Sequence, residues 1–144
     1  MKYLGMDLSA LSQQNAVHTA REIAQQPDLW QNVWQEVKRQ QPALNKFFEM
    51  AVKDSKRIIL IGAGTSAFIG LSLRGILQRK TGLTTEAIAS TDIVSHPADY
   101  FQSEIPTFLI SFARSGNSPE SEAVQSLAQE ICKNFYHLVI TCNG

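Results

Sequence analysis

A short run of apolar residues that ends in glycine constrains this fold more than any other feature. The run Arg57-Ile58-Ile59-Leu60-Ile61 leads directly into the loop Gly62-Ala63-Gly64-Thr65-Ser66. A continuous apolar run of this length, followed by glycine, is typical of a strand that is buried on both faces, as in a parallel sheet. We therefore expect an α/β architecture built around this strand.

The rest of the chain after this loop alternates between helical and strand patterns. We expect helices over about 67–80 and 118–133, strands over about 84–89, 106–112 and 136–142, and a short helix or loop over 92–100. Such alternation predicts βαβ units and a doubly wound parallel sheet. If the strand order is 2-1-3-4, the first and third strands are neighbours, and a ligand would bind between the loops at their carboxyl ends.

The first 54 residues differ from the rest in being helical in composition. We expect a loose lead-in over residues 1–9, a helix over about 10–26, a second helix capped by Asp28, and a third opened by Pro42. Phe47 and Phe48 in the third helix are interpreted as core or dimer contacts. The chain is thus divided into an N-terminal helical segment, 1–54, and an α/β domain, 55–144.

Composition excludes several classes of partner. The chain has 144 residues with 13 basic and 13 acidic side chains, so its formal net charge of zero favours neither nucleic acid nor an anionic membrane. No stretch approaches the roughly 20 apolar residues of a membrane helix, and the N-terminus lacks a secretory signal. We expect a cytoplasmic protein in which Cys132 and Cys142 are reduced core thiols rather than disulfide or metal ligands.

The first glycine loop has the chemistry of a phosphate cradle. Gly64 allows the backbone to turn sharply, and the helix that follows directs free N–H groups and a partial positive charge at the loop. Thr65 and Ser66 add hydroxyl donors. The alternative is a tight strand-to-helix turn in which Ser66 only caps the helix.

A second loop, which also leaves a predicted strand and opens a helix, repeats this chemistry. Its residues are Arg114, Ser115, Gly116, Asn117 and Ser118. Ser118 as N-cap and Pro119 at the first helical position have a purely structural explanation, but the polar residues before them do not. Glu120 and Glu122 suit a helix N-terminus without any ligand, and they would repel a phosphate unless they point elsewhere.

The two loops resemble those of the sugar isomerase (SIS) domain family. Members of that family carry a Gly-Thr-Ser loop after the first strand and a Ser-Gly-x-Ser/Thr loop after the third, which stand here as 64–66 and 115–118. Segments 58–70, 90–97, 109–121 and 136–143 are similar to one branch, the tagatose-6-phosphate ketose/aldose isomerase or galactosamine-6-phosphate deaminase group. The resemblance extends from about residue 20 to the end.

This resemblance implies a flavodoxin-like αβα sandwich and a phosphosugar ligand. By analogy, Ser66, Ser115 and Ser118 would hold the phosphate, helped by Thr65 and backbone N–H groups. The remaining expectations are sugar contacts from Thr91, Asp92 and Glu120 and phosphate-loop positions for Gly64, Arg114, Gly116 and Asn117. Many members carry a serine where this chain has Ala113, and Arg114 and Ser111 are the two candidates to replace that donor.

The resemblance also implies a tandem of two such domains in a homo-oligomer. The last strand of the first domain, the second domain and the catalytic base are then expected beyond Gly144 or on another subunit. No histidine or acid of this chain is assigned a catalytic role, and no cofactor or metal is expected. Both an isomerase and a deaminase remain open, because both need the phosphate site and a proton transfer next to the sugar carbonyl.

Two other functions compete with this interpretation. Gly62-x-Gly64-x-x-Ala67 fits a relaxed dinucleotide-binding fingerprint, and Asp92 could meet a ribose. However, Asp92 lies 28 residues after Gly64, whereas the fingerprint places its acid about 20 residues on. A non-catalytic phosphosugar sensor is the second alternative, although such sensors are usually fused to a DNA-binding module and no basic patch is visible.

Overall fold

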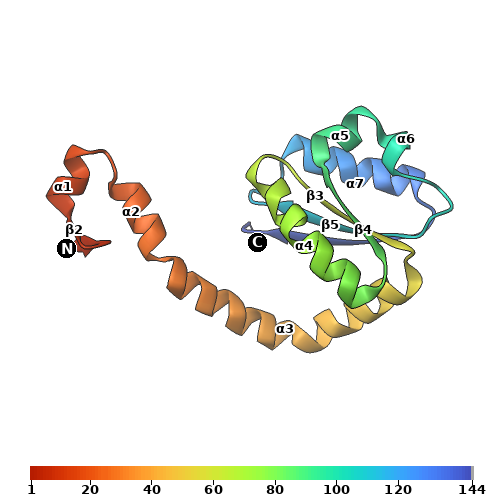
Figure 1. Cartoon of the computed structure of the whole chain (residues 1–144), viewed down its shortest axis with the longest axis horizontal. Helices are drawn as coiled ribbons and strands as arrows, with labels where there is room; N and C mark the ends of the chain where they lie inside the picture. The colour runs from red at the N-terminus through yellow and green to blue at the C-terminus, as the bar shows by residue number, and fades with distance from the viewer. Residues whose placement is uncertain (144) are drawn as a thin grey trace. The chain divides into compact units, whose positions relative to one another are not determined.

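The structure of the chain, a computed structural model, describes residues 1–143 (Figure 1). Its elements are β1 (Lys2–Tyr3), β2 (Met6–Asp7), α1 (Leu8–Gln13), α2 (Val17–Ala24), α3 (Gln26–Asp54), β3 (Arg57–Gly62), α4 (Thr65–Thr81), β4 (Thr84–Ala89), α5 (Ser90–Ser95), α6 (Pro97–Tyr100), β5 (Thr107–Ala113), α7 (Pro119–Ile131) and β6 (Phe135–Thr141). They form two compact units, one from Met1 to Lys46 and one that begins at Phe47.

The second unit is organised around a four-stranded parallel sheet. The strand order is β4-β3-β5-β6, and the first and third strands pair in register, with Ile59 beside Leu109 and Gly62 beside Phe112. The predicted α/β class, the parallel sheet and the order 2-1-3-4 are therefore confirmed. β3 and β5 are almost wholly buried because each lies between two other strands and under helices on both faces.

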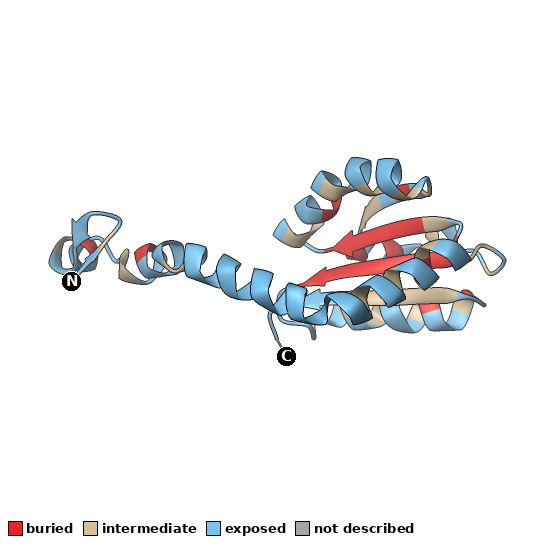
Figure 2. Ribbon diagram, turned by 90° about the horizontal axis from the view of Figure 1, so that it is seen from below, coloured by how far each residue is buried: buried red, intermediate tan, exposed pale blue. Residues whose placement is uncertain are grey.

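Helices cover both faces of this sheet and make three layers (Figure 1). One face packs against α5 and α7, and the other against α4 and the last turns of α3. In Figure 2 the red, buried strands lie between helices whose outer faces are pale blue. This is the αβα sandwich that was expected.

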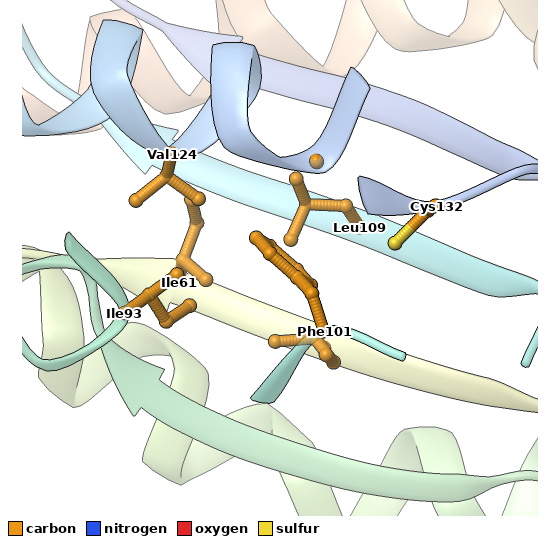
Figure 3. Packing of buried hydrophobic residues seen from close by; sticks show 8 residues of the cluster. Ile61, Ile93, Phe101, Leu109, Val124 and Cys132 are labelled. Carbon is orange, nitrogen blue, oxygen red and sulfur yellow. The ribbon is translucent and has the colours of Figure 1, made fainter. Parts of the chain in front are cut away.

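The core on the α7 side is built from aliphatic side chains that alternate along the strands. Ile61 and Leu109 point from the sheet toward Val124 of α7, with Ile93 of α5 and Phe101 closing the cluster (Figure 3). All five are buried. This packing fixes α7, and hence the loop that precedes it, over the carboxyl end of β5.

The core on the opposite face combines aliphatic strand residues with a cluster of aromatic rings. Phe47 and Phe48 of α3 both meet Phe108 edge-to-face, with ring centroids 5.8 Å apart in each case. Phe47 also contacts Tyr136, and edge-to-face pairs of this kind stabilise beyond their buried area. These contacts explain why the second compact unit begins at Phe47, before the end of α3.

The N-terminal segment departs from the expected single helix over 10–26. It contains α1 and α2, separated by a turn in which Asn15 has a φ of 53°. Asparagine tolerates this left-handed conformation, which ends α1. Residues 2–7, expected as a loose lead-in, form a small antiparallel pairing of β1 with β2.

The two helices predicted at Asp28 and Pro42 are one helix, α3, with Pro42 in its interior. Pro27 and Asp28 lie in the first turn of α3 instead of before it. A proline inside a helix removes one hydrogen bond and is unfavourable, but α3 is exposed around Pro42, so water can solvate the freed carbonyl. No glycine interrupts the segment, and the helix continues.

The cysteine prediction is correct for one residue and wrong for the other. Cys132 is a buried free thiol, and burial raises its pKa. Cys142 is free but exposed, because it follows the last residue of the edge strand β6. Among residues 1–143, no helix is long and apolar enough to cross a membrane.

Candidate functional site

The two polar loops meet at the carboxyl edge of the sheet. β3 and β5 are adjacent and parallel, so the loops that follow them lie side by side. They enclose an open hollow of about 270 Å³. Its lining residues are Ala63, Thr65, Ser66, Phe112, Ala113, Arg114, Ser115, Ser118, Glu120 and Ser121.

The first loop depends on glycine at two positions. A Cβ on Gly62 would lie 2.6 Å from the backbone carbonyl carbon of Ser66 and 2.9 Å from the nitrogen of Ala67, so only glycine lets α4 begin this close to β3. Gly64 has a φ of 56°, which L side chains rarely adopt. The tight turn places Thr65 and Ser66 in the first turn of α4, against the hollow.

The second loop ends in a helix cap. The Ser118 hydroxyl accepts a hydrogen bond from the backbone N–H of Ser121 at 3.3 Å and shares another with the Ser121 hydroxyl at 2.8 Å. Pro119 follows as the first residue of α7, where its missing N–H removes no helical bond. Capping and lining the hollow are therefore combined in Ser118.

Backbone donors are free in both loops. Within the part of the chain that the structure describes, the N–H groups of Ser115, Asn117 and Ser118 have no protein acceptor, and neither do those of Ala63 and Gly64. Clustered free N–H groups beside helix N-termini attract anions. Ala63, Ser115 and Ser118 also line the hollow, so hydroxyl and amide donors from two loops are combined there.

Two charged side chains of opposite sign line the hollow. Arg114 supplies a guanidinium that can bind a phosphate through two parallel hydrogen bonds. Glu120, in the first turn of α7, brings a carboxylate to the same wall. An anion would therefore be favoured at the Arg114 side and a hydroxyl or amino donor at the Glu120 side.

Several predicted site residues do not line the hollow. Gly64, Gly116 and Asn117 belong to the loops but contribute backbone shape rather than lining. Thr91 and Asp92 lie in the first turn of α5, after β4, and are also outside the lining. The expected sugar contacts of these two residues stay a prediction, because they would have to be made beyond the lining of this hollow.

Only one of the two candidates to replace the donor missing at Ala113 reaches the hollow. Ala113 lines the hollow, and Arg114 lies next to it, but Ser111 does not reach the hollow. The Ser111 hydroxyl instead shares a hydrogen bond of 2.7 Å with Nε2 of His137. Both residues line a separate space of about 20 Å³ beneath α7, and burial lowers the pKa of His137. Of the two candidate donors, only Arg114 is available to a ligand there.

Four lining residues were not among the predicted site residues, namely Ala63, Phe112, Ala113 and Ser121. Ser121 had a usable signal, because it is the third residue after the N-cap Ser118, where a polar side chain reaches back to the cap. For Ala63, Phe112 and Ala113, the residue type by itself gives no signal of a binding role.

The site is suited to binding and orienting an anionic ligand. Within residues 1–143, no cluster of three histidine, cysteine or acidic residues is arranged to hold a metal ion. The only carboxylate in the lining is that of Glu120. What the lining supplies most clearly is a set of donors for one phosphate group.

Comparison with known proteins identifies relatives of this arrangement. Residues 51–143 match the SIS domain family. The D-galactosamine-6-phosphate deaminase AgaS of Shewanella sp. strain ANA-3 is 47% identical over 137 residues, which cover 93% of this chain and 36% of that protein. The crystal structure of tagatose-6-phosphate ketose/aldose isomerase from Escherichia coli is 45% identical, with a TM-score of 0.82, and the match covers 87% of this chain and 34% of the other.

A further solved structure, of a Clostridium novyi NT protein, matches 99% of this chain at 43% identity with a TM-score of 0.92, over 37% of its own length. The chain therefore spans about a third of the length of each of these three proteins.

Proposed function

Because the chain belongs to the SIS domain family, we propose that it forms the phosphosugar-binding part of an aldose–ketose isomerase or amino-sugar-phosphate deaminase. The proposed substrates are tagatose-6-phosphate and galactosamine-6-phosphate, which the names of two relatives support. The observation that carries the proposal is the hollow between the loops that follow two adjacent parallel strands, lined by hydroxyl-bearing residues of both loops.

We propose that Ser66, Ser115 and Ser118 are the phosphate ligands, helped by Thr65 and Arg114. Their shared position around one hollow supports this assignment. A phosphate bound there would accept hydrogen bonds from hydroxyls, from free N–H groups and from the guanidinium. We further propose that Glu120 contacts the sugar, since a carboxylate suits a hydroxyl or amino group better than a phosphate.

The proposed reaction separates binding from proton transfer. A general base removes a proton next to the sugar carbonyl and returns it to the adjacent carbon. With a 2-amino sugar, the same intermediate can lose ammonia. Binding energy at the phosphate holds the reacting carbon against the base. In this scheme, the loops of this chain govern position, and the base lies on a part of the protein beyond residue 144 or on another subunit.

The organisation of the whole protein is also a proposal. We propose that residues 55–144 are the first of two SIS domains, which the coverage of about a third of the relatives supports. We propose a cytoplasmic homo-oligomer as well. The exposed apolar side chains of α3, among them Trp30, Val33 and Trp34, support the oligomer, and light scattering of the full-length protein tests it.

The two alternatives have less support. A dinucleotide-binding role would use Asp92, which lies outside the lining of the hollow, and would leave Ser115 and Ser118 without a purpose. A phosphosugar sensor would use the same hollow without turnover, so an activity measurement separates it from the enzyme.

The test is an ammonia-release assay on the full-length protein with galactosamine-6-phosphate and glucosamine-6-phosphate, alongside a ketose/aldose assay with tagatose-6-phosphate. We expect turnover of at least one substrate. Ammonia from one amino sugar would identify a deaminase and its epimer preference. Binding of all three without turnover would support the sensor, and no binding of any phosphosugar would contradict the proposal.

A further inference from the structure

The end of β6 is hydrogen-bonded to the second loop at several points. The Asn143 side-chain amide donates to the carbonyl of Ser115 at 3.0 Å. The Thr141 hydroxyl donates to the carbonyl of Arg114 at 3.3 Å, and the backbone N–H of Cys142 donates to the same oxygen at 3.1 Å. Thr141 and Asn143 are also bonded to each other, because the N–H of Asn143 donates to the Thr141 hydroxyl at 3.1 Å.

These bonds determine which way the loop peptides face. The C=O and N–H of a trans peptide point in opposite directions. Since the Arg114 carbonyl is held toward β6, the N–H of Ser115 in the same peptide faces away from β6. β5 lies between β6 and β3, so this N–H is directed to the side of the hollow, and it has no acceptor among residues 1–143.

The next peptide is held at both ends. The Ser115 carbonyl accepts from Asn143, and the N–H of Gly116 donates to the carbonyl of Ala113 at 3.1 Å. Gly116 has a φ of 76°, and a Cβ at this position would lie 2.8 Å from the Thr141 hydroxyl oxygen. Thr141 therefore lies against Gly116 and is also hydrogen-bonded to the carbonyl of Arg114.

We propose that Thr141 and Asn143 are positioning residues that hold the second loop in its anion-receiving conformation. By engaging the Arg114 and Ser115 carbonyls, they keep two partial negative charges turned away from the hollow and leave the Ser115 N–H turned toward it. Neither residue lines the hollow, so they act through the loop and not on the ligand. This inference rests on the proposed phosphosugar function and deepens it.

The test is isothermal titration calorimetry of the full-length protein with inorganic phosphate and with galactosamine-6-phosphate. Thr141→Val keeps the shape of the side chain and removes the hydroxyl, and Asn143→Ala removes the amide. We expect each to weaken binding of both ligands about three- to tenfold, and the double variant by more than tenfold, as for lost orienting hydrogen bonds.

Two matched variants distinguish positioning from general damage. Thr141→Ser retains the hydroxyl and should restore affinity to within about twofold, and Cys142→Ser alters the exposed side chain between the two positions and should leave affinity unchanged. Lowered thermal stability of Thr141→Val and Asn143→Ala with unchanged affinity would overturn the inference. Failure of the parent protein to bind any phosphosugar would instead overturn the proposed function, and this inference with it.

Discussion

The Ser118 hydroxyl lies 2.8 Å from the Ser121 hydroxyl and is also the acceptor for the Ser121 backbone N–H. Both side chains line the hollow between the two loops. Ser118 thus caps the N-terminus of α7 and belongs to the proposed phosphate site. A hydroxyl oxygen can accept a hydrogen bond while its hydrogen is donated elsewhere. Ser118 could therefore keep the cap and donate to a bound phosphate at the same time.

Substitution at Ser118 should separate these two roles. Ser118→Ala should lower the free energy of unfolding by about 1 kcal/mol through loss of the cap, and should also weaken phosphosugar binding. Ser118→Asp restores a cap but places a carboxylate against the phosphate, so we expect near-normal stability and a larger loss of affinity. Chemical denaturation and calorimetric titration measure the two effects. Normal affinity in Ser118→Asp would show that Ser118 only caps the helix.

Gly62 sets how closely α4 approaches β3. In Gly62→Ala, the new Cβ would meet the Ser66 backbone at 2.6 Å, and we expect a loss of about 1–3 kcal/mol in stability from the forced shift. Gly75→Ala is the matched control, because its Cβ would meet only the end of the Arg79 side chain at 3.4 Å. Alanine in that helical position should be neutral or stabilising by up to about 1 kcal/mol. Equal thermal stability of the two variants would contradict the packing described here.

The half-buried His137 gives stability a pH dependence of known sign. In the folded state, burial lowers the pKa of His137 below its ordinary value of 6.5. Folding therefore favours the neutral imidazole. The contribution of His137 to the free energy of unfolding is therefore complete above the pKa of the unfolded state. It is lost as the pH falls from that value toward the lower pKa of the folded state. Between about pH 7.5 and about pH 5.5, the drop in melting temperature should be smaller in His137→Gln, which can still bond to Ser111. An identical drop in parent and variant would assign the pH dependence to other groups.

The sheet could be predicted from local pattern because its strands are apolar runs that end at turn residues. The predicted strand over 84–89 and β4 have the same bounds, and the other strands differ by about a residue. Helix ends in the first 54 residues could not be predicted as well. Pro42 is a strong local signal for a break, yet α3 is exposed there and continues.

The candidate site shows the same division between local and distant information. The hydroxyl residues of both loops were identifiable because each loop follows a strand and opens a helix. The bond between Ser111 and His137, and the contacts of Thr141 and Asn143 with the second loop, join residues about 26–28 positions apart. They depend on the register of β5 with β6, which no single segment encodes.

The most direct test of the account compares galactosamine-6-phosphate with galactosamine in calorimetric titrations of the full-length protein and of Ser115→Ala. If the hollow binds the phosphate, the phosphorylated sugar should bind more than about tenfold more tightly than the free sugar, and Ser115→Ala should remove most of that difference. Equal affinity for the two sugars, or an undiminished preference in Ser115→Ala, would contradict the assignment of this hollow to the phosphate.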